Sequence, residues 1–460
     1  MNRLTRLNNG QIVLFLFCAL CFIALPAFCP AADLYQKEIR TTVEESIKAI
    51  LTGQAYSKPL ERRQVALRTM FEKGTVSKAD LEAMAEEAII PVMERYTTSR
   101  YILKDAPARV EALLSPYMSW DEVKKIAWKV GSGMIPDGEQ VVITIGTLAP
   151  PGTPWMSIPE KVLIPRMAEL SNNKFIVKIY GGGIMGEDTD ILRKMDIGQL
   201  DGCGCTALGI LAASPDTAVF LLPGMYQNYD EIDYITAKFR KRIDQAYEKR
   251  GYILAALIDT GMFYIFSSNR ITDLNDLKRL NFSTWFGDIE TALYKELGIS
   301  GTPVAVPETI SAFSTGMINA NIAPAAWMLG MQAYQYVNYY VKQPILYSPA
   351  AVVISVQTKE RLKKRFGISE TFALNVQEML IYEVSTLEKE WRELSRSYEA
   401  KCLDAFEKKC GIKAVTLSAR DQQTLEKAYL NVREELADKV YPRDLMEDIK
   451  KALAAYRAGK

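Results

Sequence analysis

The chain has 460 residues, of which 48% are hydrophobic and 24% are charged, and its 56 basic residues nearly balance its 55 acidic residues. This length predicts two or three domains, and the balanced charge gives no indication of nucleic acid or an anionic membrane surface as a partner. The sequence contains no histidine, which excludes Ser-His-Asp and Cys-His catalysis and any histidine-ligated metal. Carboxylate, lysine and cysteine chemistry remain open.

Residues 1–32 have the pattern of an export signal. Arg3 and Arg6 precede a continuous apolar run, Ile12–Leu25, which has the length of a signal core and is short for a membrane span. Small residues around Ala31 offer a cleavage site. We therefore predict a protein of the periplasm, released by cleavage, with an uncleaved membrane anchor as the alternative.

Residues 33–137 carry helix signals only. An apolar stripe at helical spacing stops at Gly53, Ser77 is a good N-cap, and Ser119 with Glu122 forms a capping box. The region predicts a small all-α domain of three to five helices without a catalytic constellation. By elimination, we expect it to serve in spacing or in docking a protein partner.

After a glycine-containing linker, Gly131–Gln140, strand and helix patterns alternate. Strands are expected at 141–148, 174–182, 201–205 and 252–268, and helices at 154–172, 188–199 and 229–250. This alternation predicts an α/β fold with a mostly parallel sheet flanked by helices. The stretch Ile271–Pro324 supplies a second set of elements, with a helix that opens at Pro307.

The C-terminal part predicts long helices. The chain is extended again near Val352, and a stripe at three-four spacing follows. Its members are Phe372, Val376, Leu387, Trp391, Leu394, Tyr398 and Cys402. Cys402 and Cys410 are about two helical turns apart, and Cys203 and Cys205 are two residues apart on a strand. Neither pair can bridge easily, so we interpret these thiols as packing residues; the alternative, a metal-binding CxC, lacks a second pair of ligands.

The segment GGGIMG, Gly181–Gly186, satisfies the spacing of a dinucleotide-binding fingerprint. Glu187, Asp188 and Asp190 follow at once and place carboxylates where a pyrophosphate would lie. Export also removes the protein from nucleotide cofactors. We therefore predict a tight strand-to-helix turn, with the nucleotide site as the alternative, and expect no cofactor and no metal.

Five segments in order resemble one family. They are IGTLAPPGTPWM, IYGGGIMGEDTDILRKMDIGQLDG, FLLPGMYQNYDE, FSSNRITDLNDLKRLNFST and PVAVPETISAFSTGMINANIAP. From Val141 to about Ser418 the chain resembles the extracytoplasmic solute receptors of TRAP transporters, the DctP-type family. The resemblance implies a two-lobed periplasmic-binding-protein-like fold that closes by a hinge on one small molecule, usually an organic acid, and passes it to a membrane permease.

The resemblance also implies domain boundaries. The first lobe is expected at 138–268 and 345–365, the second lobe at 269–344, and the long C-terminal helices at 366–460, packing across both lobes. The helical region at 33–137 lies outside the resemblance.

The chain departs from the family at the residues expected to bind a carboxylate. The family's main arginine falls on Ser283, a second arginine falls near Phe263 or Tyr264, and an asparagine before a proline falls on Ala323. A buried carboxylate needs such a partner, so we predict a more apolar pocket. The expected ligand-binding residues are Trp155, Cys203, Thr206, Tyr226, Phe263, Ser283, Trp285, Ala323 and Trp327, with Met156, Thr284 and Met328 as further candidates; the alternative is that the aromatic side chains belong to the core.

The function predicted is therefore a periplasmic receptor of a TRAP-type system for a less anionic, more hydrophobic small molecule. The alternative is a receptor-fold protein that has been repurposed for signalling or envelope interaction through its helical N-terminal domain. An enzyme is disfavoured, because the sequence has no histidine and no pair of catalytic carboxylates that we can place.

Overall fold

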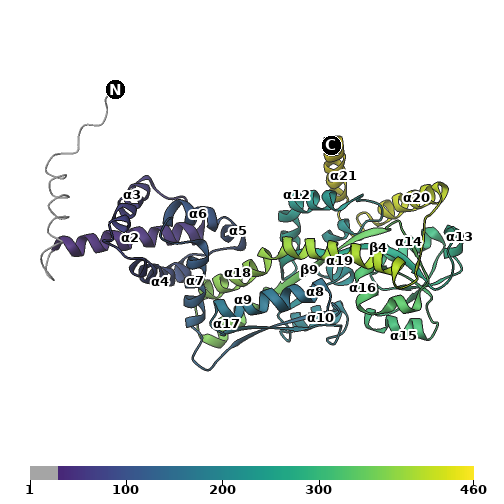
Figure 1. Cartoon of the computed structure of the whole chain (residues 1–460), viewed down its shortest axis with the longest axis horizontal. Helices are drawn as coiled ribbons and strands as arrows, with labels where there is room; N and C mark the ends of the chain where they lie inside the picture. Colours follow the sequence, from purple (N-terminus) through teal and green to yellow (C-terminus); the bar gives the residue numbers. More distant parts are fainter. Residues whose placement is uncertain (1–29, 460) are drawn as a thin grey trace. The chain divides into compact units, whose positions relative to one another are not determined.

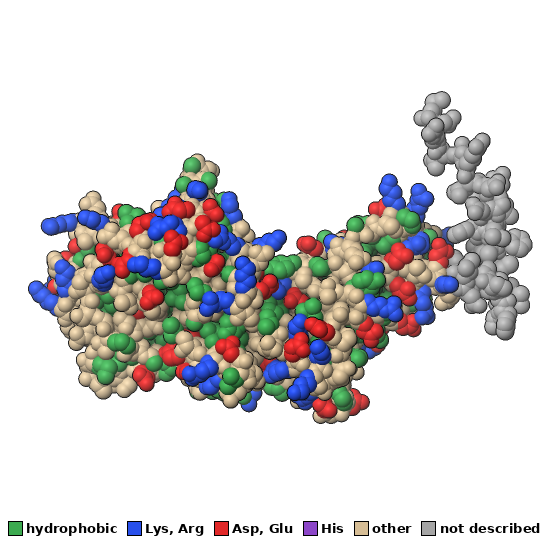
Figure 2. All heavy atoms as spheres, turned by 180° about the vertical axis from the view of Figure 1, so that it is seen from behind, with side chains coloured by type: hydrophobic (Ala, Val, Ile, Leu, Met, Phe, Trp, Pro, Cys, Tyr) green, Lys and Arg blue, Asp and Glu red, His purple; other side chains and the backbone are tan. Residues whose placement is uncertain are grey.

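The computed structural model describes residues 30–459, and these divide into two compact units, 30–130 and 131–459 (Figure 1). The predicted export signal lies almost wholly outside the described residues. Within them, no helix combines the length and the apolar character needed to cross a membrane. Basic and acidic side chains are interspersed over the face shown in Figure 2.

The first unit is all-helical. Helix α2 contacts α3, α4, α5 and α6, and its buried stripe includes Val43, Ile47 and Ile50. The predicted caps are present: Ser77 and Ser119 begin α4 and α7 through capping boxes. Its described helices are α2 (Pro30–Thr52), α3 (Lys58–Glu72), α4 (Lys78–Arg95), α5 (Arg100–Lys104), α6 (Ala106–Leu114) and α7 (Trp120–Gly133). The prediction of three to five helices was one short of the six that are observed, and α7 extends into the segment expected to be a linker.

The second unit is built on one mixed sheet, with strand order β2-β1-β3-β9-β4-β7-β5-β6, and with β8 beside β4 and β10 beside β8. Its strands are β1 (Val141–Thr147), β2 (Phe175–Tyr180), β3 (Gly202–Cys205), β4 (Tyr252–Ser267), β5 (Asn281–Thr284), β6 (Ser300–Pro303), β7 (Ala320–Pro324), β8 (Tyr339–Val341), β9 (Leu346–Ser355) and β10 (Lys413–Val415). We call the part around β1, β2 and β3 the first lobe and the part around β5, β6 and β7 the second lobe.

The expectation of a mostly parallel sheet was wrong at the centre of the sheet. β1 is parallel to β2 and β3, and β5 is parallel to β6 and β7, but β4 and β9 are antiparallel to each other. The reason is the path of the chain, which leaves the first lobe on β4 and returns to it on β9. These two long strands are therefore shared between the lobes.

The rest of the second unit consists largely of helical segments around this sheet (Figure 1). They are α8 (Pro154–Ile158), η1 (Pro159–Leu163), α9 (Ile164–Leu170), α10 (Asp188–Asp196), α11 (Ala207–Ala213), η2 (Pro215–Phe220), α12 (Tyr229–Glu248), α13 (Leu274–Leu277), α14 (Asp288–Leu297), η3 (Val306–Glu308), α15 (Thr309–Ser314), α16 (Ala325–Gly330), η4 (Ala333–Tyr336), α17 (Thr358–Phe366), α18 (Glu370–Thr386), α19 (Glu388–Lys408), α20 (Ala419–Leu436) and α21 (Arg443–Ala458).

One predicted helix, 154–172, is interrupted. Its middle part, η1, is a π-helix between α8 and α9. Pro159 begins η1 and Pro165 follows it, and neither proline can donate a backbone hydrogen bond, so the regular α-helical pattern is disturbed on both sides.

Helix α19 crosses from one lobe to the other, because it contacts α8 of the first lobe, α16 of the second lobe and β4 between them. The stripe predicted for this region is largely buried, as Phe372, Trp391 and Cys402 show, but Leu394 is exposed. The inclusion of Leu394 was wrong because the stripe was read as continuous across Leu387, where α18 ends and α19 begins.

Buried acids hold α19 against β4. Asp259 of β4 is fully buried, and its Oδ2 lies 2.5 Å from the Nε of Arg396 on α19. Gly261 lies two residues further along β4, where it adopts a φ of +114° at a register shift. The N–H of the next residue, Met262, donates to Oε2 of Glu399 on α19 at 3.1 Å. These contacts fix the point at which β4 passes between the lobes.

Candidate functional site

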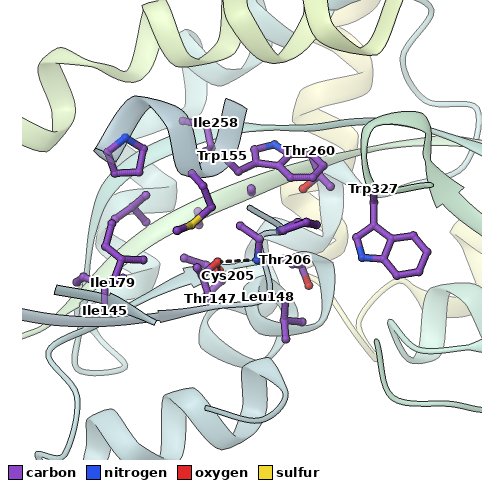
Figure 3. A pocket seen from close by; sticks show the side chains of 18 of the residues that line it. Ile145, Thr147, Leu148, Trp155, Ile179, Cys205, Thr206, Ile258, Thr260 and Trp327 are labelled. Atoms are coloured by element: carbon purple, nitrogen blue, oxygen red, sulfur yellow. Dashed lines mark hydrogen bonds between the residues drawn. The ribbon is translucent and has the colours of Figure 1, made fainter. Parts of the chain in front are cut away.

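A cavity of about 100 Å³ lies between the sheet and its covering helices and extends from the first lobe to the second. Figure 3 shows its side chains from close by: Ile145 and Ile179 lie at one end of the view and Trp327 at the other, with Trp155 between them. The cavity therefore has two parts, which we call the aliphatic slot, in the first lobe, and the polar end, in the second lobe.

The aliphatic slot follows from strand alternation. Ile143 and Ile145 of β1 pair in register with Val177 and Ile179 of β2, so all four side chains are on one face of the sheet. β9 adds Val352 and Ile354 to the same face. The side chains that cover this face come from three helical segments and are Met156, Pro159, Leu163, Leu380 and Val384. The slot is lined by hydrocarbon almost throughout.

The polar end is built from neighbouring strands of the second lobe. Phe282 of β5 pairs with Ala320 of β7 in a parallel register. The next residue on each strand, Ser283 and Asn321, therefore lies beside the other, and both line the cavity with Ala323. Ser283 is 1% exposed and Asn321 is 2% exposed, so the polar end is closed from solvent.

Four indole rings of the described residues border the cavity: Trp155, Trp285, Trp327 and Trp391. The Nε1 of Trp155 donates to the carbonyl of Asp259 at 2.9 Å, and the Nε1 of Trp285 donates to the carbonyl of Ile322 at 3.2 Å. These bonds fix two of the rings, so that Trp155 and Trp285 present apolar surface to the cavity.

No lysine, arginine, aspartate or glutamate is among the described residues that line this cavity. The arginines near it are engaged elsewhere: Arg392 and Arg396 pair with Asp233 and Asp259. An ionised carboxylate in the cavity would therefore lose its hydration without gaining a cation, which is strongly unfavourable.

Most hydroxyl groups on the cavity wall are already bonded within the protein. Thr147 Oγ1 donates to the Gly204 carbonyl at 2.8 Å, Thr206 Oγ1 donates to Asp188 Oδ2 at 2.6 Å, and Thr260 Oγ1 donates to the Pro349 carbonyl at 3.0 Å. These threonines close the wall and leave little hydrogen-bonding capacity for a bound molecule.

Four buried polar atoms on the wall have no partner within the described chain: Ser283 Oγ, Asn321 Oδ1, Trp327 Nε1 and Trp391 Nε1. The first three belong to the second lobe, and Trp391 is on α19. An unpaired buried polar group costs about 1–3 kcal/mol, and nearly all such groups in proteins have a partner. The second lobe is therefore where this cavity can bond a guest, through a hydroxyl, an amide and an indole N–H.

The structure brings six of the nine residues expected to bind ligand to the cavity wall, which are Trp155, Thr206, Ser283, Trp285, Ala323 and Trp327. Of the further candidates, Met156 lines the wall, whereas Thr284 and Met328 do not. Their contact with a ligand remains a prediction.

The other three expected residues lie elsewhere. Cys203 is on the opposite face of β3 from Gly204 and is fully buried, with its Sγ 4.0 Å from Asp188 Oδ1. The hydroxyl of Tyr226 donates to the Val219 carbonyl at 3.0 Å. Phe263 is fully buried and stacks on Trp285 with ring centroids 5.7 Å apart, so it supports a wall residue from behind.

Sequence reasoning missed Asn321 and all of the aliphatic slot except Met156. Asn321 could have been found, because it is two residues before Ala323 on a strand and must face the same way. Ile143, Ile145 and Ile179 carried no such signal, because an apolar residue on a strand of an α/β protein is ordinarily core.

The glycine segment is a tight turn, with positive φ at Gly182, Gly183 and Gly186. The acids after it act as caps: the Glu187 N–H donates to Asp190 Oδ2 at 3.2 Å, and Asp188 accepts from Thr206 and Gly209. The turn also touches the second lobe, because Glu187 Oε1 accepts a hydrogen bond from the Val306 N–H. The described structure thus has its two lobes in contact beside the cavity, which Val306 also lines, and we call this arrangement the closed form.

The fold and the site together define a class: a two-lobed α/β receptor with a cavity enclosed between its lobes. The chain belongs to the DctP family, the bacterial extracellular solute-binding proteins of family 7, whose family model matches residues 145–439. This confirms the predicted membership among TRAP solute-binding proteins. The family consists of extracytoplasmic solute receptors rather than enzymes.

Solved structures with the same fold are distant in sequence. A TRAP solute-binding protein of Desulfovibrio salexigens with bound orotic acid has a TM-score of 0.61 at 17% identity, covering 68% of this chain and 99% of that chain. One from Haemophilus influenzae with bound L-gulonate has a TM-score of 0.59 at 17% identity, with the same coverage. A solute-binding protein of Roseobacter denitrificans is 21% identical over 207 residues, 45% of this chain and 63% of the relative, which is less than two thirds of its length.

Proposed function

We propose that this protein is an extracytoplasmic receptor for an uncharged, largely apolar small molecule, which it holds in the cavity between its lobes. Delivery to a TRAP-type membrane permease, and action in the periplasm, follow from the family and are part of the proposal. The observation that carries it is the cavity wall, which has no charged side chain among the described residues and three unpaired polar atoms in the second lobe.

The proposal assigns roles to the wall. Ser283 and Asn321 bond the polar group of the ligand, and Trp327 donates its indole N–H to it. Trp155 and Trp285 cover the apolar part of the ligand from two sides. Thr206 and Ala323 complete the wall by contact, and Phe263 holds Trp285 in place.

The proposed ligand differs in charge from the acids bound in two solved relatives, orotic acid and L-gulonate. Those acids belong to those proteins. In this chain a serine occupies the position at which the family resemblance expects an arginine, and Ser283 has no cation beside it on the cavity wall.

The test is native purification of the full chain, followed by mass spectrometry of the small molecules released on denaturation. A calorimetric titration then compares the identified compound with succinate and with indole. We expect an uncharged, poorly water-soluble compound to co-purify and to bind at least a hundredfold more tightly than succinate. Tighter binding of succinate than of any uncharged compound would refute the proposal.

A second candidate function is signalling or envelope interaction through the helical unit. The observation in its favour is that residues 36–130 lie wholly outside the matched range, 145–439. A folded protein that releases no small molecule, and binds none in the titration, would favour this second function over the first.

A further inference from the structure

The cavity is elongated. Its wall draws on seven neighbouring strands in the order β2-β1-β3-β9-β4-β7-β5. Strands in a sheet are about 4.8 Å apart, so the wall runs across the sheet for several times the width of a small organic acid. The separation of Ile179 from Trp327 in Figure 3 follows this direction.

The two ends of the cavity differ in chemistry. Beside Ile143, Ile145, Val177 and Ile179 the wall is branched aliphatic, which suits a flexible hydrocarbon. The unpaired hydrogen-bonding atoms of adjacent strands, Ser283 Oγ and Asn321 Oδ1, lie in the other lobe. The distribution therefore matches a molecule with one polar group and one apolar tail.

The helical cover of the slot is irregular where a tail would lie. Pro159 and Leu163, the first and last residues of the π-helix η1, both line the cavity. A π-helical turn departs from the regular α-helical pattern and is often found at functional sites. The irregular turn therefore supplies part of the apolar cover of the slot.

The reach of the wall sets the length of the tail. The aliphatic slot draws on the neighbouring strands β2, β1, β3 and β9, and three strand spacings of about 4.8 Å amount to about 14 Å. An extended chain of about eight to ten carbon atoms has about that length, whereas a four-carbon acid reaches across only part of the slot.

We propose that the ligand class is a medium-chain, uncharged amphiphile, such as a fatty alcohol or an acylglycerol of that chain length. Its polar group bonds Ser283 and Asn321, and its alkyl chain lies in the aliphatic slot between the sheet and η1. This inference rests on the proposed function and adds the shape of the ligand to it.

The test titrates the full chain with 1-butanol, 1-hexanol, 1-octanol, 1-decanol and 1-dodecanol, and with indole as a compact apolar probe. Burial of each methylene group strengthens binding by about fourfold, so we expect the dissociation constant to fall by that factor per carbon up to about ten carbons and then to level off. Ser283→Ala is expected to weaken every alcohol about threefold to tenfold and to leave the slope per carbon unchanged.

A second measurement uses a variant in which a larger side chain fills part of the aliphatic slot. Leu163→Phe lies in η1 on the wall, and Leu170→Phe, also buried and nearby on α9, lies off the wall as a matched control. We expect only Leu163→Phe to move the point of levelling to shorter chains, by two or more carbons. Ile145→Phe, on the sheet side of the slot, provides the same measurement if Leu163→Phe does not fold.

The outcomes separate the two proposals. Indole binding together with alcohol affinities that do not depend on chain length would overturn this inference and leave the proposed function standing. Succinate binding without binding of any alcohol would overturn both. Failure of all these probes to bind the folded chain would also overturn the inference.

Discussion

The carboxylate of Glu187, at the start of α10 in the first lobe, accepts a hydrogen bond from the backbone N–H of Val306 in the second lobe. Gly183 of the same turn also lies close to Pro307 of the second lobe. A Cβ atom added to Gly183 would lie 2.9 Å from Pro307 Cγ, which is too close for two carbon atoms. The glycine segment that resembles a nucleotide site in sequence thus makes a contact between the lobes beside the cavity.

Gly183→Ala should weaken ligand binding by holding the lobes apart. The added methyl group meets Pro307 in the closed form, and the φ of +75° also strains an alanine. Gly182→Ala is the matched control, because it has a similar φ of +65° but its added methyl group meets nothing within 4 Å. We expect both variants to lose about 1 kcal/mol of stability, and only Gly183→Ala to bind ligand at least fivefold more weakly, measured by calorimetry and thermal unfolding. Equal loss of affinity in both variants would show that backbone strain, rather than contact between the lobes, is responsible.

Closure should be favoured by mildly acidic pH. The pKa of Glu187 is raised from its ordinary value of 4.5 to about 7, mainly by burial and also by repulsion from Asp188 and Asp190, against the hydrogen bond from Val306. Since opening the lobes exposes the carboxylate again, the closed form binds the proton more tightly than the open form. Ligand affinity should therefore fall as the pH rises from 4.5 through 7.

The matched variant for this prediction is Glu187→Gln, which keeps an oxygen to accept from Val306 but does not titrate. Its affinity should change less than that of the wild type between pH 5 and pH 8, as measured by titration at each pH. A wild-type affinity that increases with pH over this interval, by an amount that Glu187→Gln abolishes, would contradict the sign.

Glu290 should make the protein less stable at alkaline pH. It is fully buried on α14 and accepts from the N–H groups of Trp285 at 2.7 Å and Phe286 at 3.2 Å, while the Tyr294 hydroxyl donates to its other oxygen at 3.1 Å. Burial raises its pKa to about 8 despite these bonds. The folded state therefore holds a proton that the unfolded state releases above 4.5, so this contribution to stability is complete below pH 4.5 and is lost as the pH rises to 8.

Two substitutions separate charge from hydrogen bonding at this position. Glu290→Gln should gain stability relative to the wild type as the pH rises from 5 to 8, measured by urea unfolding at each pH. Glu290→Ala should lose about 2 kcal/mol or more at pH 5, because two buried N–H groups lose their acceptor, and this difference from the wild type should shrink as the pH rises to 8. A constant difference between Glu290→Gln and the wild type across this interval would rule out the titration.

Asp259→Asn should destabilise the protein by about 3 kcal/mol, because it removes the fully buried charge that pairs with Arg392 and Arg396. Asp233→Asn removes a partner of the same two arginines whose side chain is 47% exposed, and it should cost less than about 1 kcal/mol. Chemical unfolding measures the loss of stability in each variant, and we expect the larger loss for Asp259→Asn. If α19 were held to β4 by apolar contacts alone, this difference would be absent or reversed.

The resemblance in sequence led to the right fold because its five segments lie on elements that build both lobes, from β1 to β7. Local signals were also sufficient for the caps at Ser77 and Ser119, where a side chain and a backbone group three residues apart form the whole motif. The lobe boundaries and the role of the helical unit remain predictions.

The direction of the central strands was not predictable in the same way. A strand pattern reports which faces of a segment are buried, and it does not report which strand lies beside it. Pro159 and Pro165 indicate in the sequence that the helix is disturbed near η1. Whether two prolines end a helix or turn part of it into a π-helix depends on what packs against them.

The amino-acid sequence by itself determined that the site lacks the charged partners of an acid, because Ser283 and Ala323 are visible without coordinates. Only the tertiary structure decided that Ile143, Ile145 and Ile179 line a cavity rather than a core. The physical reason is that a cavity is an absence of packing between segments distant in the chain, here β1, β2 and η1. Whether an isoleucine touches a neighbour or empty space depends on the position of both segments.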